Sequence, residues 1–445
     1  MSRPRLVVCG GGLAGIAAAC EGALQGAAVT LVERRPFLGG KAFSFRLGTR
    51  GPQIDNGQHV FLGCCSAYRW LLRTLGTEHL TTLQGRLHVP VRDRAGATGV
   101  LAASLLPPPL SIGPSFARYP HLSIREKRDV MVGIASLIKM TEEERHALDE
   151  TSFADWLADR GQSPEAIERF WDLIVLPTCN DRSTRVSTTL AALVFREGLL
   201  RTRTGSAIGY ARSGLGELVN PSVSRFLRRY GGTIMLDHGV LAADATGVVL
   251  STGERLSADA VVLALPPERI AEVAPLPTIG QGLGSSPIVN IHLWYDRPVM
   301  RGPFLAVIDS PAQWVFNRSH LSDGPGQHLV ISVSAATDDI DTPRERIADR
   351  YVAEMGELFP AARHAALERV HVVKEPLATI SPAPGQAALR PPNHTAEAGL
   401  AIAGAWTDTG WPATMEGAVR SGLLAARAAL GPSGTPSFGS RTISR

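Results

Sequence analysis

The stretch that decides the fold lies near the N-terminus and reads Leu6-Val7-Val8-Cys9-Gly10-Gly11-Gly12-Leu13-Ala14-Gly15. Its apolar residues 6–9 predict a short buried strand, and the glycines that follow predict a tight turn. An Ala-rich helix is expected over residues 13–25 and a second strand over residues 28–32. This segment therefore predicts a strand-turn-helix-strand unit.

The glycines of the turn have the spacing Gly10-x-Gly12-x-x-Gly15. The first lets the chain turn sharply, the second leaves room for a pyrophosphate beside the backbone, and the third lets helix and strand pack closely. Phosphates are expected at the helix N-terminus, where unpaired N–H groups and the helix dipole favour anions. Glu33 follows the second strand at the distance expected of a ribose-binding acid. Together these features predict a bound dinucleotide.

Two further segments contain glycine at positions where a cofactor could pass. The loop after Glu33 reads Arg34-Arg35-Pro36-Phe37-Leu38-Gly39-Gly40-Lys41, a glycine pair followed by a cation. An apolar strand near the C-terminus ends at Gly404. The chain then continues Ala405-Trp406-Thr407-Asp408-Thr409-Gly410-Trp411-Pro412-Ala413-Thr414-Met415-Glu416-Gly417-Ala418 and enters a helix of small and apolar residues.

The composition bounds the remaining possibilities. The 445 residues carry 45 Lys+Arg against 41 Asp+Glu, a net charge of +4, and 44% are hydrophobic but only 19% charged. This balance excludes a disordered chain, and the length favours two closely joined domains. No apolar run is long enough to span a bilayer, so the apolar excess is expected inside the protein or on a membrane surface. The sequence contains no basic cluster that would indicate a nucleic-acid partner.

The cysteines and the N-terminus indicate a cytoplasmic protein. The 5 cysteines stand at scattered positions without disulfide or metal-ligand spacing, so reduced structural thiols and no metal are expected. Arg3 and Arg5 precede an apolar run that ends at Cys20 and superficially looks like a secretory signal. The glycines of the turn break that run where the core of a signal is continuous, which argues against it.

The glycine pair and the C-terminal segment resemble those of the flavin-containing amine oxidase and phytoene desaturase superfamily. The resemblance implies an α/β fold, with a Rossmann-like FAD-binding domain and an inserted α+β substrate domain. The FAD domain is expected over residues 1–85, 205–285 and 396–430, the substrate domain over residues 86–204 and 286–395, and a flexible tail over residues 431–445. The implied cofactor is FAD, and its expected contacts are Gly10, Gly12, Leu13, Ala14, Gly15, Glu33, Arg34, Gly39, Gly40, Lys41, Val240, Gly404, Asp408, Thr414, Met415, Glu416 and Ala418.

This chain departs from the superfamily pattern at two of these positions. Lys41 stands where relatives usually have Arg, and an ammonium neutralises phosphate without the bidentate fork of a guanidinium. Many relatives carry an acid directly after the glycine that matches Gly404, where it binds the flavin ribityl chain. This chain has Ala405 there, and Asp408 is the candidate for that contact.

One stretch is similar to the hydroxysqualene dehydroxylases, flavoproteins of bacterial hopanoid synthesis. It reads Ile54-Asp55-Asn56-Gly57-Gln58-His59-Val60-Phe61-Leu62-Gly63-Cys64-Cys65, and residues 410–422 are similar to the same group. Members replace the hydroxyl of a C30 isoprenoid alcohol with hydrogen, giving squalene. The resemblance implies an FAD-dependent oxidoreductase with a hydrophobic C30 isoprenoid substrate. Its electrons would come from a nicotinamide nucleotide or a reduced flavin.

Asp55, Gln58 and His59 form the densest polar group beside a predicted cofactor loop. Hydroxide is a poor leaving group, so cleavage of a C–O bond requires a positioned acid in a water-poor pocket. We hypothesise that Asp55 or His59 protonates the departing hydroxyl and that Gln58 orients it. Because Asp55-Asn56-Gly57 is also a turn sequence, the group equally fits a flavin contact or a helix cap.

The middle of the chain supplies the apolar interior. Residues 95–117 carry no charge but contain several prolines, so they cannot form a spanning helix. An amphipathic helix is expected over residues 125–140. The two segments would form either a membrane-dipping entrance or a buried loop with a surface helix. The first arrangement implies peripheral contact with the inner face of the cytoplasmic membrane.

Two other functions stay open. Carotenoid-type desaturation or amine oxidation uses the same cofactor in the opposite redox direction. Amine oxidation would require an aromatic pair near the flavin, for which Trp406 and Trp411 are candidates. A non-catalytic isoprenoid carrier stabilised by flavin would bind FAD without being reduced by a nicotinamide nucleotide.

Overall fold

A parallel sheet forms the centre of the first domain in the computed structural model, which describes residues 3–49, 51–321 and 326–431. The strand order is β10-β2-β1-β14-β20, and neighbouring strands pair in parallel. The strands are β1 Arg5–Cys9, β2 Ala28–Val32, β10 Thr233–Met235, β14 Ala260–Leu263 and β20 Leu400–Ile402. Segments from both ends and the middle of the chain therefore meet in one sheet.

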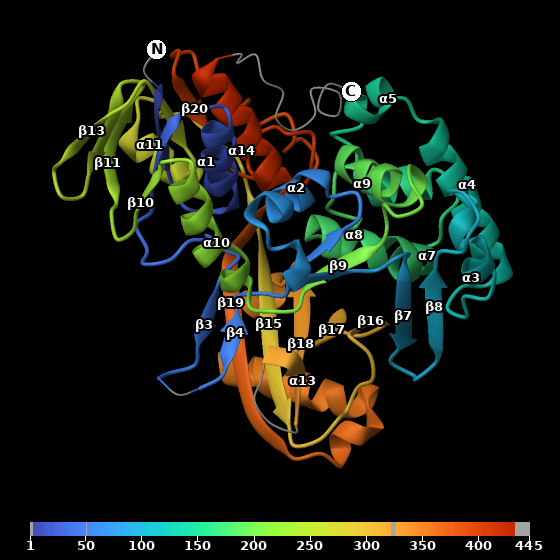
Figure 1. The fold of residues 1–445 in the computed structure, drawn as a ribbon. Coiled ribbons are helices and arrows are strands. Elements are labelled where there is room, and N and C mark those ends of the chain that lie inside the picture. The colour runs from blue at the N-terminus through green and yellow to red at the C-terminus, as the bar shows by residue number, and fades with distance from the viewer. Residues whose placement is uncertain (1–2, 50, 322–325, 432–445) are drawn as a thin grey trace.

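Helices made largely of small and apolar residues cover one face of this sheet. They are α1 Leu13–Leu24, α2 Ser66–Leu75, α10 Leu215–Arg229 and α14 Met415–Leu430. Helices α1 and α14 lie side by side (Figure 1). A Cβ atom on Gly422 of α14 would lie 2.0 Å from the carbonyl oxygen of Ala14 in α1. This close approach depends on the absence of a side chain at residue 422.

An antiparallel layer covers the other face of the parallel sheet. It consists of β11 Val240–Asp244, β12 Gly247–Leu250 and β13 Arg255–Ser257, with α11 Pro267–Val273 beside it. Val248 and Ile270 from this layer are fully buried in one cluster with Val7 and Val261 of the sheet. The first domain is thus a three-layer α/β sandwich, and the predicted fold class is confirmed.

The second domain is built on a larger mixed sheet with the order β19-β15-β18-β17-β16-β7-β8. Its strands are β7 His88–Asp93, β8 Thr98–Ala102, β15 Ser285–Tyr295, β16 Phe304–Ile308, β17 Trp314–Asn317, β18 Gln327–Ser334 and β19 Leu367–Ile380. The pair β16–β7 is parallel, and its neighbours in the sheet pair antiparallel. Two distant parts of the sequence therefore share one sheet.

Helices pack on both sides of the larger sheet. Helices α12 Thr337–Ile340 and α13 Arg344–Leu358 cover one face, where Ile347 and Met355 bury against Leu329 and Ile331. The other group packs around β7, β8, β16 and β17 and is shown on the right of Figure 1. It contains α3 Gly113–Ala117, α4 Ile124–Lys139, α5 Glu142–Ala147, α6 Phe153–Ala158, α7 Pro164–Ala166, α8 Asp172–Cys179 and α9 Thr188–Phe195.

Short elements connect the two domains. The hairpin of β3 Ser44–Arg46 and β4 Gln53–Asp55 and the small sheet of β5 Val60–Leu62, β9 Ile208–Ala211 and β6 Thr81–Leu83 lie between them. Single helical turns span Glu78–Leu80, Leu110–Ile112, Ile167–Trp171, Arg196–Leu200, Ser319–Leu321 and Pro360–Arg363. The connecting elements place segments of both domains around one region.

The expected strands, turn and helix of the N-terminus are present, and α4 matches the amphipathic helix expected over residues 125–140. All strands of the parallel sheet fall inside the ranges expected for the FAD domain. Nearly all of the expected tail, residues 431–445, lies outside the described residues. Within residues 3–49, 51–321 and 326–431, no helix combines the length and apolarity needed to cross a membrane.

The contact between α1 and α14 gives a test of the fold. We expect Gly422→Ala to lower the free energy of unfolding by about 1–3 kcal/mol, because the new methyl group meets the Ala14 carbonyl and forces the helices apart. The matched control is Gly356→Ala in α13, whose methyl group would meet Arg363 at an ordinary 3.6 Å. It should gain about 0.5–1 kcal/mol from helix propensity. Urea unfolding compares the two, and equal effects would contradict the close helix contact.

Candidate functional site

The N-terminal glycine loop packs tightly against the protein at Gly10 and Gly15 but leaves open space beside Gly12. Cβ atoms on Gly10 and Gly15 would lie 2.3 Å and 1.8 Å from backbone oxygens, whereas a Cβ on Gly12 would have no neighbour closer than 3.8 Å. Gly12 caps α1 without a side-chain hydrogen bond, and the first turn holds no acid. The start of α1, at Leu13 and Ala14, therefore offers free backbone N–H groups to an anion, which fits the phosphates of a dinucleotide.

Glu33 lies beside this loop, as its spacing predicts. Its carboxylate accepts hydrogen bonds from the N–H groups of Gly11 (2.6 Å) and Arg35 (2.9 Å). The glycine pair also lies against the loop, because Gly39 donates its N–H to the carbonyl of Gly11 at 2.8 Å. Gly40 has a φ of +61°, and a Cβ there would lie 2.9 Å from Gly12. The two glycine segments thus form one continuous surface for a cofactor.

Two of the three cations after Glu33 have hydrogen-bond partners within the protein. The Lys41 ammonium donates to the backbone carbonyls of Leu377 and Ala378 on β19, so it ties the glycine pair to the substrate sheet rather than to a phosphate. Arg34 is exposed. Arg35 instead turns inward and donates to the carbonyl of Gly40 at 3.1 Å. An ammonium with two carbonyl acceptors is satisfied within the protein, and the expected contact of Lys41 with the cofactor stays a prediction.

The C-terminal segment forms a loop that leads from β20 to α14. Gly404 has a φ of +156°, and a Cβ there would lie 2.2 Å from the Trp406 indole. Arg390 is buried and holds the loop by donating to the carbonyls of Trp411 (2.6 Å) and Ala405 (2.7 Å). Burial lowers the pKa of Arg390 to about 10. Sequence reasoning missed this residue, because an isolated arginine in a loop gives no local signal.

Two acids of this segment have other partners than a cofactor. Glu416 is 1% exposed, and its carboxylate caps α2 by accepting from the N–H groups of Ala67 (3.1 Å) and Tyr68 (2.8 Å). It also pairs with Arg420 at 2.7 Å. The Glu416 carboxylate therefore has a structural role, and the expected contact of this residue with FAD stays a prediction. Asp408 is exposed and accepts from the N–H of Gly410 at 3.0 Å, so its contact with the ribityl chain stays a prediction.

The remaining residues expected to contact FAD lie at the start of α14 and the start of β11, and their contacts stay predictions. Thr414, Met415 and Ala418 are half-buried at the N-terminus of α14, where Thr414 accepts from the N–H of Gly417 at 3.3 Å. Val240 is buried at the start of β11, on the far side of the parallel sheet from α1. The start of α14 follows β20, and Val240 follows β10. Both strands belong to the parallel sheet whose strands β1 and β2 lead into the glycine loops. In open α/β sheets ligands bind at the carboxyl ends of the strands.

Asp55 is an anchor between the two domains. Its Oδ2 accepts from the Arg318 guanidinium at 2.6 Å, and the two side chains are 4% and 3% exposed. Its Oδ1 accepts from the hydroxyl of Ser44 (2.7 Å) and from the N–H of Leu215 (2.9 Å), the first residue of α10. A carboxylate with these three donors has no proton to give. The structure therefore speaks against Asp55 as the proton donor and for the helix cap that its turn sequence left open.

His59 and Gln58 lie on a turn against the larger sheet. His59 places Nδ1 at 3.0 Å from the carbonyl of Gly57, an oxygen that only accepts, so Nδ1 carries the proton and Nε2 has the lone pair. Burial lowers the pKa of His59 below its ordinary value, which keeps the ring neutral near pH 7. The Gln58 N–H faces the Oδ1 of Asn290 on β15 at 3.5 Å. Asn290 is 1% exposed and was not predicted.

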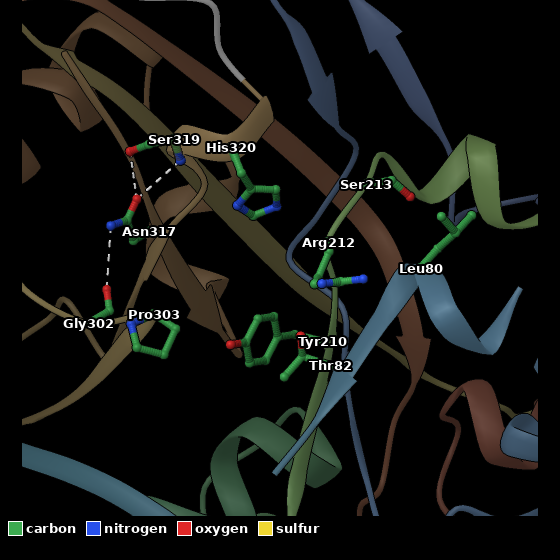
Figure 2. A pocket seen from close by; sticks show the side chains of 10 residues that line it. All are labelled: Leu80, Thr82, Tyr210, Arg212, Ser213, Gly302, Pro303, Asn317, Ser319 and His320. Carbon is green, nitrogen blue, oxygen red and sulfur yellow. Dashed lines mark hydrogen bonds between the residues drawn. The ribbon is translucent and has the colours of Figure 1, made fainter. Parts of the chain in front are cut away.

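A cavity of about 720 Å³ opens at β9, the strand that pairs with β5 after this turn, and it is in the size range of small-molecule sites. Figure 2 shows its lining: Leu80, Thr82, Tyr210, Arg212, Ser213, Gly302, Pro303, Asn317, Ser319 and His320. Tyr210 of β9 is the strand partner of Val60, the residue after His59. Burial and the neighbouring Arg318 charge lower the pKa of His320 to about 4. The cavity thus combines polar groups, among them the Arg212 guanidinium, with an apolar wall.

Aromatic rings continue from the apolar wall into the second domain. Tyr210 meets Phe304 edge-on with ring centres 6.1 Å apart, and Phe304 lies 5.9 Å from Trp314. Trp314 stacks on Phe316 at 6.0 Å. In the described ranges, no group of three or more His, Cys, Asp or Glu residues could hold a metal ion. These rings belong to the apolar core behind the cavity, whereas the cavity lining itself mixes apolar and polar side chains.

Comparison with known proteins places the chain in a family. Residues 13–430 match the family described as flavin containing amine oxidoreductase. The chain is 32% identical to a hydroxysqualene dehydroxylase of Rhodopseudomonas palustris, over 94% of this chain and 96% of that protein. It is 25% identical to a 15-cis-phytoene desaturase of Synechococcus elongatus, over 96% of both chains.

Among solved structures, an oxidoreductase from Methanosarcina mazei is similar in fold, with a TM-score of 0.72 and 18% identity over 94% of this chain and 99% of that one. The glycine loops that fit a dinucleotide are thus those of an FAD-dependent oxidoreductase. The chain belongs to the family of flavin containing amine oxidoreductases and, within it, to the group of the hydroxysqualene dehydroxylases.

Proposed function

We propose that the protein removes the hydroxyl group of hydroxysqualene reductively and forms squalene. The observation that carries the proposal is that the Gly57–His59 turn is connected to the glycine pair through Asn56 and to Tyr210 of the cavity lining through Val60. The Asn56 amide beside this turn donates to the carbonyl of Lys41 at 3.2 Å, which fixes the turn to the glycine pair. The similarity to the Rhodopseudomonas protein over nearly the whole chain supports the choice of substrate.

The reaction needs a hydride and a proton. When bound, reduced FAD supplies the hydride that forms the new C–H bond and is itself oxidised by two electrons. The C–O bond breaks with its electron pair on oxygen, and a proton from the protein converts the departing hydroxyl into water. The electrons are proposed to come from a nicotinamide nucleotide or from free reduced flavin.

His59 is the residue that we place beside the departing hydroxyl. Its Nε2 is free of the Gly57 contact, and an imidazolium in this buried position is a stronger acid than an ordinary histidine. A proton that reaches Nε2 therefore passes on readily to an oxygen. The hydrocarbon part of the substrate would lie along Leu80, Tyr210 and Pro303 of the cavity lining, whose apolar surfaces keep water away from the reacting carbon.

An apolar edge on the second domain fits peripheral contact with a membrane. Leu105 is 75%, Leu110 56% and Ile124 88% exposed, on the segment before α3 and at the start of α4. Lys127 of α4 donates to the carbonyl of Ala117 at 2.8 Å, so the two segments lie together. Exposed Arg125 and Arg128 flank them. Exposed leucines beside arginines are typical of surfaces that bind anionic lipids, the source of a hydrocarbon substrate.

The alternative functions use the same cofactor surface. Phytoene-type desaturation is favoured by the similarity to the Synechococcus protein. For amine oxidation, Trp406 is buried against the carbonyl of Leu265 and Trp411 lies under the Arg420 guanidinium, so the two indoles have structural partners. Nothing in the geometry favours a carrier without catalysis over an enzyme.

The first test is the reaction itself. We expect the FAD-loaded protein, reduced by dithionite without oxygen, to convert hydroxysqualene to squalene while the flavin is reoxidised in equal amount. Gas chromatography of the hydrocarbons and flavin absorbance measure the two. Oxidised enzyme with phytoene is the control. New double bonds in phytoene, with no squalene in the first arm, would support the desaturase instead. FAD binding without turnover in either arm would support the carrier.

The second test separates His59 from Asp55. We expect His59→Gln to retain FAD and thermal stability but to lose about 10²-fold or more in the rate of squalene formation. Asp55→Asn should instead lose about 3–5 kcal/mol of stability, because Arg318 is left buried without its counter-charge. Flavin content, thermal unfolding and turnover distinguish these effects. A stable, FAD-loaded and inactive Asp55→Asn would return the acid role to Asp55.

The third test concerns the membrane. We expect the double variant Leu105→Glu, Ile124→Glu to lose binding to vesicles with anionic lipid in flotation assays, because charge replaces exposed apolar surface. Leu241→Glu is the matched control, since Leu241 is 56% exposed on β11 of the other domain. It should bind vesicles as the unchanged protein does. Equal binding by all three proteins would contradict the contact surface.

A further inference from the structure

A buried arginine without an ion-pair partner holds the loop between β20 and α14. Arg390 is 8% exposed, and its guanidinium donates to the carbonyls of Ala405 and Trp411 at 2.7 Å and 2.6 Å. Its Nε is buried and has no hydrogen-bond partner in the described part of the chain. In residues 3–49, 51–321 and 326–431, none of the ion pairs includes Arg390. A buried charge without a partner is costly, so a nearby negative charge would stabilise it.

The carboxylates that act on this guanidinium have other hydrogen-bond partners. Asp149 accepts from the Ser187 hydroxyl at 2.7 Å. Asp408 is exposed and accepts from the N–H of Gly410 at 3.0 Å. Both carboxylates raise the pKa of Arg390 as charges at a distance, but burial has the larger effect and lowers that pKa to about 10. Arg390 therefore stays charged at neutral pH, and its charge is only partly offset.

The space beside Arg390 is too small for a polyatomic counter-ion. A cavity of about 10 Å³ lies there, and its lining includes Ser381, Gln386, Arg390 and Ala413. A cavity of this size has room for about one water molecule, and none for a carboxylate or a phosphate. Ala413 directly precedes Thr414, the N-cap of α14, so the small cavity also adjoins the start of that helix.

The loop that Arg390 holds lies at the edge where open α/β sheets bind their ligands. The Gly404–Thr414 loop follows the carboxyl end of β20, a strand of the parallel sheet. At the far end of the loop, the Thr414 hydroxyl accepts from the N–H of Gly417. The N–H groups of Met415 and Glu416 have no partner within the helix. The helix N-terminus and the buried guanidinium thus both place positive charge at this loop.

We propose that Arg390 is a positioning residue for the reduction of FAD: it holds the Gly404–Thr414 loop through two carbonyls, and its charge stabilises the negative charge of the reduced flavin. FAD takes up two electrons and one proton to become a reduced anion, so reduction adds one negative charge to the site. A guanidinium that is not neutralised favours this charge and shifts the equilibrium toward reduced FAD. The inference concerns the cofactor alone, so it stands or falls independently of the proposed dehydroxylation.

Two variants separate the charge from the contact with the loop. Arg390→Lys and Arg390→Gln both lose the guanidinium fork and keep a donor for one loop carbonyl, but only the lysine keeps the charge. We expect Arg390→Gln to shift the equilibrium toward oxidised FAD by about tenfold, which is about 30 mV in midpoint potential for a two-electron couple. Arg390→Lys should keep the potential of the unchanged protein. Anaerobic titration against a redox dye, followed by flavin absorbance, measures the potentials. Arg185→Gln is the matched control, because it removes a positive charge from an ion pair with Asp181, and its potential should not change.

Flavin content and thermal unfolding show whether each variant is folded and loaded. If Arg390→Gln binds too little FAD, Asp149→Asn gives the comparison in the opposite direction. It removes a negative charge that offsets Arg390, so it should favour reduced FAD. Equal potentials in Arg390→Lys and Arg390→Gln, or no rise in Asp149→Asn, would overturn the role of the charge. A potential of the unchanged protein that falls when chloride replaces a larger anion would also overturn it, because a bound ion would then neutralise Arg390.

Discussion

The ion pair between Asp55 and Arg318 is the contact on which the site depends. Asp55 belongs to β4 and caps α10 of the FAD domain, whereas Arg318 directly follows β17 of the substrate sheet. The guanidinium also donates to the carbonyl of Ala211 on β9 at 2.6 Å. One buried pair thus joins a hairpin, a helix and two sheets. Because a buried charge without its partner costs several kcal/mol, the relative position of the two domains is fixed where they meet.

The rest of the site follows from this junction. The Gly57–His59 turn leaves β4 immediately after Asp55 and ends in β5, which pairs with β9. The carbonyl of Ser213, at the entry to α10, accepts from the same guanidinium at 3.3 Å. The cavity lies between these segments and the chain after Arg318. Arg318 therefore holds both the turn, through Asp55, and the cavity wall, through Ser213.

The sequence was most informative where chemistry is local. The glycine loop, Glu33 and the start of α14 could be predicted because backbone geometry and spacing along a few residues determine them. Asp55 was predicted as a possible proton donor, and its pairing with Arg318 was missed. Arg318 stands 263 positions away in the sequence and belongs to no motif. The contact of Glu416 with α2 was missed for the same reason, since Ala67 lies 349 positions away in the sequence. A motif identifies which residues matter but not what they contact.

The charge balance of the site bears on the proposed dehydroxylation. In that reaction, cleavage of the C–O bond would leave positive charge on carbon, and a nearby imidazolium would oppose that charge strongly in a buried site. Burial lowers the pKa of His59, His292, His320 and His328, so these rings stay neutral, and Asp55 compensates Arg318. Arg212 also lines the cavity, but a guanidinium does not act as an acid. In the proposed dehydroxylation, no histidine of the site would hold a stored proton at neutral pH, so the proton would have to arrive as the bond breaks.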